Sequence, residues 1–245
     1  GIRRLINLSD VRIYDHEGRE ALVLPAVHNV VSWRSLLFAE LRLSSLIIDS
    51  PRLAVRRDAA GRLFVAGLEL AAAGGAERGG RLAAWILGQR EIEIRNAEIE
   101  WVDLLREAPP LKLSALNLRL RNAGGVHAVG LSARPPKALG TSLVVRAELA
   151  GGPVTVPSKW DGRLYAEFGD TDLAAWQPWV DYPFELRQGR GAVRMWVTLG
   201  AGQRVRSTLD VELSNVVMQL ATDLPRLALA KLAGRLEGRA EGRTF

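Results

Sequence analysis

Cysteine is absent from this chain of 245 residues. Its absence excludes disulfide bonds and thiol catalysis, and it leaves the redox compartment undetermined. Histidine is scarce too, because only His16, His28 and His127 occur, far apart and with no metal-ligand spacing between them. The chain also has neither a Gly-x-Ser-x-Gly nucleophile elbow nor a phosphate-binding glycine loop that ends in Lys-Ser/Thr. We therefore expect no enzyme activity, no bound metal and no cofactor.

Long apolar runs are missing as well. No stretch approaches the roughly 20 apolar residues that a membrane-spanning helix needs, and residues 1–4 (GIRR) are not a signal peptide. The chain starts without methionine and ends just after another apolar alternation. We expect a segment of a longer protein that forms one unit over 1–245. Any subdivision would fall at the linker-like stretch 71–80 (AAAGGAERGG).

Lysine is rare, since only four of the 33 basic residues are lysine and the others are arginine. The formal net charge of +6 is compatible with nucleic acid or an anionic membrane surface. However, the arginines alternate with leucine and valine, which indicates a solvated outer face of a β-sheet with protected edges. The glutamates Glu91, Glu93, Glu98 and Glu100 alternate with isoleucine in the same way. They too indicate a solvated face rather than a pair of acid/base catalysts.

Aromatic residues make up only 6% of the chain, although seven of them are tryptophan. Tryptophans can stack on nucleic-acid bases, but such platforms usually interleave aromatic and basic residues on one sheet face. Only three tyrosines and five phenylalanines are available to assist. We expect the tryptophans to pack in a core or a groove.

The most informative pattern in the chain is a set of apolar residues at offsets 0, 2, 5 and 7. Successive side chains of a strand point to opposite faces, so the step of three would move the second apolar pair to the wrong face. A one-residue β-bulge corrects this slip and bends the strand. The seven sets are Ile6/Leu8/Val11/Ile13, Leu41/Leu43/Leu46/Ile48, Leu46/Ile48/Pro51/Leu53, Ile92/Ile94/Ala97/Ile99, Leu111/Leu113/Leu116/Leu118, Val211/Leu213/Val216/Met218 and, more loosely, Leu227/Leu229/Leu232/Gly234.

Alternating runs between glycine and proline turns predict an all-β fold of about twelve to sixteen strands. We expect a long, strongly curved antiparallel meander that forms a trough with an apolar concave face. The slips near Ser50-Pro51, Asn96-Ala97, Ser114-Ala115 and Asn215-Val216 would form its floor. Expected turns lie at 58–61, 109–110 and 124–125, and expected short helices lie near 32–38, 81–89 and 171–176.

Several short motifs along the chain resemble one bacterial family. The first is the block 46–67 (LIIDSPRLAVRRDAAGRLFVAG), with an apolar strand, a proline-containing bend and a glycine turn. The others are Trp85-Ile86-Leu87-Gly88-Gln89, Ile92/Ile94, Trp101 with Asp103, Ala108-Pro109-Pro110-Leu111, His127, Arg134-Pro135-Pro136, Leu139-Gly140, Trp160 to Tyr165, Asp172 to Trp176 and Gly189-Arg190-Gly191. On these motifs the chain resembles the AsmA-like family of bacterial envelope proteins and, within it, the YhdP branch.

The resemblance implies a periplasmic protein that an N-terminal helix, not present in this chain, anchors in the inner membrane. It also implies a bridge-like lipid transfer protein, in which the apolar inner face of a curled β-sheet carries phospholipid acyl chains between the inner and outer membranes. The expected partners are those acyl chains, adjoining segments of the same protein, and proteins of the two membranes.

The apolar residues around the slips are the candidate lipid-binding residues. They are Leu46, Ile48, Leu53, Ile92, Ile94, Ile99, Trp101, Leu116, Leu118, Val211, Leu213 and Met218. The alternative for each residue is that it belongs to an ordinary core. At the level of function, the alternatives to lipid conduction are a scaffolding β domain of the cell envelope and, least favoured, nucleic-acid binding through the positive charge.

Overall fold

The computed structural model describes residues 4–14, 20–31, 43–65, 68–70, 88–151, 161–200 and 204–240. These residues form fourteen β-strands. The strands are β1 (Arg4–Tyr14), β2 (Glu20–Val31), β3 (Leu43–Asp49), β4 (Arg52–Arg57), β5 (Leu63–Val65), β6 (Leu68–Leu70), β7 (Glu91–Asp103), β8 (Ala108–Ala123), β9 (Val126–Arg134), β10 (Ser142–Ala150), β11 (Asp161–Asp172), β12 (Glu185–Gly200), β13 (Arg204–Gln219) and β14 (Leu227–Ala240). The all-β prediction and the expected number of strands are confirmed.

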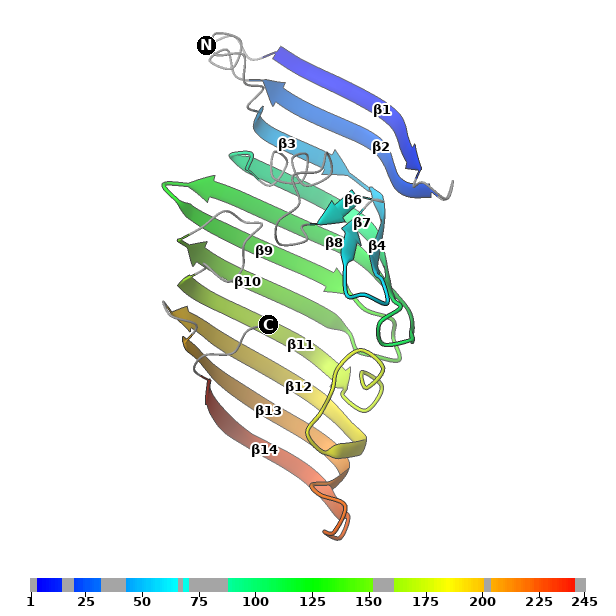
Figure 1. Cartoon of the computed structure of the whole chain (residues 1–245), viewed down its shortest axis with the longest axis vertical. Helices are drawn as coiled ribbons and strands as arrows, with labels where there is room; N and C mark the ends of the chain where they lie inside the picture. Colours follow the sequence, from blue (N-terminus) through cyan, green and yellow to red (C-terminus); the bar gives the residue numbers. More distant parts are fainter. Residues whose placement is uncertain are drawn as a thin grey trace.

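All described strands belong to one open sheet, in which β1 lies near one end and β14 at the other (Figure 1). From β7 to β14 each strand pairs antiparallel with its sequence neighbour, as the predicted meander requires. Strands β3 and β4, however, both pair parallel with β7. The sheet is therefore mixed, and the expectation of a wholly antiparallel sheet was wrong at this place.

Strands β3 and β4 are two halves of one bent strand. Both lie between β2 and β7, and the chain is interrupted between them only at Ser50-Pro51. Two hydrogen bonds hold the break against β7, from Ser50 N to the Arg95 carbonyl at 2.8 Å and from Glu98 N to the Pro51 carbonyl at 2.9 Å. The slip that the sequence predicts here is thus a bend, and β7 pairs with the chain both before it and after it.

The four slips expected to form the floor each coincide with a residue of positive φ. Ser50, Asn96, Ala115 and Asn215 have φ values of 52°, 50°, 47° and 51°. The β7–β8 and β8–β9 registers shift at the bulges that contain Asn96 and Ala115. The sets at 6–13 and 227–234, by contrast, show no register shift at their slips in the β1–β2 and β13–β14 pairs. Asp170, with a φ of 40°, forms a further bulge between β11 and β12. The strands accordingly curve towards the end where the β11–β12 connection lies (Figure 1).

Asn117 compensates for the backbone hydrogen bonds that two adjacent bulges disrupt. A bulge leaves backbone groups without a partner on the neighbouring strand. The Asn117 Oδ1 accepts from Asn96 N at 3.1 Å, and its Nδ2 donates to the Ala115 carbonyl at 3.1 Å. One carboxamide therefore serves the bulges of both β7 and β8.

The expected short helices are not found among the described residues. Where a helix was expected from 171 to 176, Thr171 and Asp172 end β11 and a series of turns follows, with hydrogen bonds such as Trp176 N to the Leu173 carbonyl at 3.2 Å. Pro178 prevents these turns from continuing as a helix, because it lacks the required N–H. Residues 32–38 and 81–87, and the suggested subdivision at 71–80, lie outside the described residues. Residues 88–90 form a turn and a bend.

Candidate functional site

The side chains of the sheet separate into an apolar face and a polar face, and the twelve candidate residues share the apolar one. Along β7 and β8 the leucines and isoleucines that pack together alternate with charged residues, as a period of two requires. In the C-terminal strands Val211, Leu213 and Met218 lie on the corresponding face. Leu53 joins this face because it lies opposite Ile99 of β7.

Four hydrophobic clusters make up the apolar face. The first contains Leu46, Ile92 and Leu120 with Ile48, Ile94 and Val129. The second contains Ala97, Leu116 and Ala133 with Ile94, Ile99, Leu113, Leu118 and Leu131. The third contains Leu111, Leu139 and Trp176 with Trp101, Leu113, Phe168, Ala175 and Trp179. The fourth contains Leu186, Val193, Leu213, Val216 and Met218 with nine half-buried neighbours, among them Phe168, Val211 and Leu232.

Shared residues make these clusters one continuous surface. Ile94 packs against both the first and the second cluster. Leu113 joins the second to the third, and Phe168 joins the third to the fourth. The apolar face therefore continues from β3 to β14 across the bulges.

The candidates differ in how deeply they are buried. Leu46, Ile92, Leu116, Leu213 and Met218 are buried, in the first, second and fourth clusters. The others, which are Ile48, Leu53, Ile94, Ile99, Trp101, Leu118 and Val211, are half-buried. The half-buried residues retain surface that a ligand could contact, whereas the buried five are enclosed by their neighbours on the same face.

Sequence reasoning missed several members of this face. Leu111 and Val216 stood in the offset pattern but were not chosen, although both are buried. Phe168 belongs to a further set, Ala166/Phe168/Thr171/Leu173, that has the same offsets. Its third residue is threonine, so an apolar search passes over it. Thr171 is nevertheless buried, and its hydroxyl can be buried at low cost because Oγ1 donates to the Leu139 carbonyl at 2.8 Å.

The turns from 173 to 180, with the residues up to Phe184, pack against the apolar face at the bend. Their side chains pack against the cluster that contains Val193, before the Asn215 row, and Leu186, beyond it. The segment therefore covers the apolar face at the bend, as expected for the inner face of a trough. Trp176 is the centre of this contact, since its Nε1 donates to Thr171 Oγ1 at 2.8 Å and to the Leu139 carbonyl at 3.2 Å.

One hydrogen bond closes this segment on itself, and one ion pair joins it to the β7–β8 turn. The half-buried Tyr182 donates its hydroxyl proton to the Leu173 carbonyl at 2.9 Å. Burial, together with the neighbouring Asp172 carboxylate, raises the pKa of Tyr182 to about 12. Arg106, in the β7–β8 turn, donates to the two Asp181 carboxylate oxygens through Nη1 and Nη2, and this pairing lowers the pKa of Asp181.

The Arg106 turn is itself fixed by a buried carboxylate. Arg57 of β4 donates to Asp103 through Nε at 2.9 Å and also through Nη2, and Arg106 N donates to the same carboxylate at 3.2 Å. Burial alone would raise the pKa of Asp103, but the hydrogen bonds from Arg57 and Arg106 outweigh it and the pKa is lowered. Asp103 therefore remains a carboxylate that links β4, β7 and the turn.

A comparison with known families settles the chain's membership. The family model described as YhdP protein matches residues 1–245. The chain belongs to the YhdP family. YhdP-family proteins are bacterial envelope proteins that fall within the AsmA-like group, as the motifs of this chain had indicated. No curated protein and no solved structure matched the chain.

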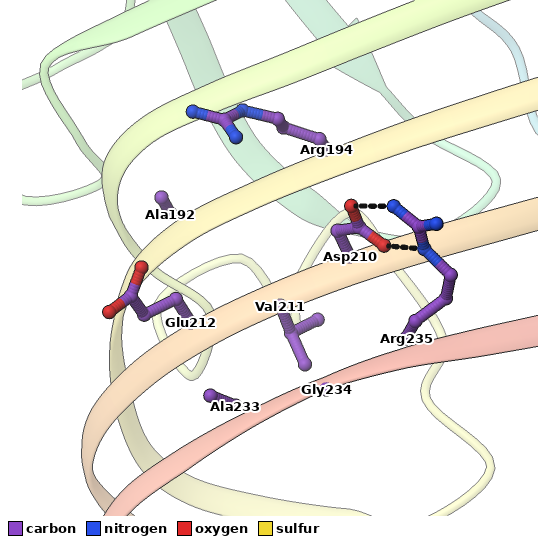
Figure 2. Close-up of a pocket in the computed structure, with 8 residues that line it drawn as sticks. All are labelled: Ala192, Arg194, Asp210, Val211, Glu212, Ala233, Gly234 and Arg235. Atoms are coloured by element: carbon purple, nitrogen blue, oxygen red, sulfur yellow. Dashed lines mark hydrogen bonds and ion pairs between the residues drawn. The ribbon is translucent and has the colours of Figure 1, made fainter.

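The polar face of this YhdP-family chain is lined by ion pairs between strands, as the arginine alternation predicts. The hollow of about 530 Å³ between β12, β13 and β14 is an example (Figure 2). Arg235 binds Asp210 at 2.6 and 2.7 Å there, while Arg194 and Glu212 complete a balanced set of charges. The glutamates of β7 likewise pair with basic residues, as Glu91 does with Arg119 and Glu100 with Lys112, rather than with one another.

The described part of this YhdP-family chain was also compared with the requirements of a metal site and of a membrane-spanning helix. No group of three or more His, Cys, Asp or Glu side chains there could hold a metal ion. No helix among the same residues is long and apolar enough to cross a membrane.

Proposed function

We propose that this chain is a lipid-conducting segment of a bridge-like protein. In this proposal phospholipid moves between the inner and outer membranes along the apolar inner face of the bent sheet, and this supply supports the permeability barrier of the outer membrane. The observation that carries the proposal is the continuity of the apolar face from β3 to β14 through Ile94, Leu113 and Phe168. Membership of the YhdP family supports it independently.

The physical reason is the cost of moving an acyl chain through water. Each exposed methylene group costs about 0.8 kcal/mol, so a conduit must offer apolar surface without interruption. The bulges meet this need because they return the apolar side chains to the same face beyond each bend. Transport then consists of sliding or exchange along the face, with no covalent step. The headgroups remain in water or near arginines at the open side.

The half-buried residues are the ones that would contact acyl chains. Ile48, Ile94, Leu118 and Val211 are examples, spread from β3 to β13. The partners in this proposal are phospholipid, adjoining segments of the same protein and proteins of the two membranes. The proposed location is the periplasm, with an anchor in the inner membrane supplied by a helix outside this chain.

Two neighbouring substitutions on β12 test the proposal. Val197 is half-buried on the inner face opposite Leu164, whereas Thr198 is exposed on the polar face. Val197→Asp places a charge among acyl chains. Thr198→Asp adds the same charge at the next residue of the strand, where the side chain lies on the other face. We expect wild type and Thr198→Asp to carry co-purified phospholipid and to take up a fluorescent lipid, and Val197→Asp to lose most of both.

The readouts are lipid extraction with mass spectrometry and fluorescence of the added lipid, with circular dichroism as the check on folding. Wild-type protein that carries no phospholipid and takes up no fluorescent lipid would contradict the proposal. That result would favour the scaffolding alternative, as would a Val197→Asp protein that is unfolded because its site is a filled core. The half-buried Ile94→Asp, placed in another cluster, repeats the comparison at a second position.

A further inference from the structure

The polar outer face has a second hollow, and its floor is made by small residues of β9. Ala128 and Gly130 lie opposite Arg121 and Arg119 of β8 on one side. On the other side they lie opposite residues of β10, where Gly130 faces Arg146. Because β9 offers no long side chain here, a shallow hollow of about 480 Å³ lies between the flanking arginines.

The charges around this hollow are not balanced, in contrast to the hollow of Figure 2. Glu91 Oε1 accepts from both Arg119 and Arg121, at 2.6 to 3.0 Å. Arg163, on the far side, binds Glu148 at 3.0 Å. The Arg146 side chain has no ion pair or hydrogen bond among the described residues.

Two more carboxylates lie beside the hollow, and each has a cation of its own. Glu93, opposite Arg119, binds Arg95 at 2.9 Å. Glu167, which accepts from the Tyr165 hydroxyl at 2.8 Å, pairs with Arg194 at 3.5 Å. The four guanidinium groups of the hollow therefore face two carboxylates, which leaves an excess of two positive charges.

An aromatic pair continues the hollow beyond Arg146. Tyr165 of β11 lies directly opposite Arg146, and Trp196 of β12 lies directly opposite Tyr165. The two rings are 5.3 Å apart at their centroids, and Trp196 is 38% exposed. With a strand spacing of about 4.8 Å, Arg146 and Trp196 stand roughly 10 Å apart on one face. The hollow thus has a cationic part and an aromatic part within the length of one small molecule.

We propose that this hollow binds a phosphate group, with Arg146 as its main ligand. A phosphate monoester carries close to two negative charges at neutral pH, which matches the excess charge of the site. Its oxygens suit the planar fork of a guanidinium better than a single ammonium would. The aromatic pair provides a flat surface for the ring or chain that carries the phosphate. Free phosphate, a phosphorylated small molecule and an anionic lipid headgroup share this chemistry.

Gly130 allows the hollow to be filled without disturbing the sheet. A Cβ built at Gly130 meets nothing within 4 Å, and its φ is not positive. Valine suits a strand better than glycine, so Gly130→Val keeps every arginine while it occupies the floor. Arg146→Gln removes the unpaired charge instead. Arg226→Gln, at an exposed arginine just before β14, makes the same charge change as a control. The row that begins β14 pairs Leu227 with Met218, ten residues along β13 from Thr208, which lies opposite Trp196.

The experiment is a titration with inorganic phosphate, followed by NMR of the arginine Nε–H and tryptophan indole signals. The Arg146 signal is identified by its loss in Arg146→Gln. We expect saturable shifts of the Arg146 and Trp196 signals in wild type and in Arg226→Gln. Gly130→Val and Arg146→Gln should bind roughly tenfold or more weakly. Sodium chloride at matched ionic strength should produce no comparable shift.

A second arm distinguishes the sources of the phosphate. Vesicles of phosphatidylglycerol, compared with vesicles of phosphatidylcholine, show whether the hollow binds an anionic lipid headgroup. Glucose 6-phosphate shows whether a phosphorylated small molecule binds more tightly than the free phosphate ion. Shifts that do not saturate, or equal affinity in wild type and both site variants, would overturn the proposal. These results do not depend on lipid on the inner face, so either proposal can fail alone.

Discussion

At the residue scale, Ala115 shows that a bend in this sheet can require an unfavourable backbone conformation. Its φ of 47° lies in the left-handed region, which costs an L-residue roughly 1–2 kcal/mol. Asn96 and Asn215 tolerate the same region better, because asparagine is one of the residues that adopts it. Ala115 remains there because Asn117 satisfies its carbonyl and because the apolar pattern needs the slip.

Ala115→Gly should therefore stabilise the protein. Glycine relieves the strain but loses more entropy on folding, so we expect a net gain of roughly 0.5–1 kcal/mol in the free energy of unfolding. Ala123→Gly is the matched control, since it lies in the same strand without a positive φ and should cost about 0.5–1 kcal/mol. Urea denaturation of the two variants gives the comparison, and equal losses would show that the bulge carries no strain.

Tyr182 gives a prediction for alkaline pH. Its pKa of about 12 is higher than the ordinary value of 10.0, so the folded state favours the neutral phenol. The stability that this group contributes is fully present below about pH 10 and is lost as the pH rises through about 12, on the order of 2 kcal/mol in all. Tyr182→Phe cannot ionise. The difference in unfolding free energy between wild type and Tyr182→Phe should therefore change across this window, and two parallel pH curves would contradict the assignment.

At the element scale, the segment that follows β11 depends on Trp176. Its ring is 7% exposed and packs edge-on against Phe168 at 5.7 Å and Trp179 at 5.8 Å. Trp176→Ala should cost about 3–5 kcal/mol, because it leaves a cavity at the junction of two clusters. Val180→Ala, at an exposed position of the same segment, should change stability by less than about 0.5 kcal/mol. Thermal or urea unfolding measures both, and similar losses would mean that the segment is not anchored by this ring.

The strands of this sheet could be predicted from the sequence more fully than their connections. Alternation and the one-residue slip depend on neighbouring residues alone, so Asn96 and Asn215 were located without a structure. Pro109-Pro110 was expected to be a turn, but β8 already begins at Ala108 and the turn lies at 104–107. The prolines are accommodated because the β7–β8 register shifts there and their missing N–H groups are not needed. The Gly124-Gly125 turn was predicted correctly.

The sequence could predict which residues share the face of the candidate site, but not how deeply each of them is buried. A period of two assigns Ile92 and Ile99 to one face, yet Ile92 is 4% exposed and Ile99 is half-buried. Leucines flank both residues from the neighbouring strands, but they differ in burial. Leu46 and Leu120, beside Ile92, are buried. Leu53 and Leu113, beside Ile99, are half-buried. Likewise, the hollow above Gly130 forms because Arg119 of β8 and Arg146 of β10 lie on either side of that residue. Register between strands decides both features, and no local pattern encodes it.

At the scale of the whole molecule, the open sheet predicts a gradient of backbone protection. Strand β7 is paired on both sides, with β3 and β4 on one side and β8 on the other. Among the described strands, β14 pairs only with β13. Hydrogen exchange followed by mass spectrometry should therefore find the slowest amides in β7 and β8 and the fastest in β14 and β1. Equal protection of β14 and β12 would contradict this order and would indicate a partner on the outer edge.

The parallel pairing of β3 and β4 with β7 also determines when these strands can be completed during synthesis. Ser50 and Asn96, which meet at the bend, are 46 residues apart in the sequence. At 5–20 residues per second, the ribosome needs about 2–9 s to add the intervening chain. During that time the edge of β4 that later pairs with β7 has no partner. Each later hairpin of the meander, by contrast, can form as soon as its two strands have emerged. The three arginines of β4 (RLAVRR) place charge on that edge, which is where a nascent strand most needs protection from mispairing.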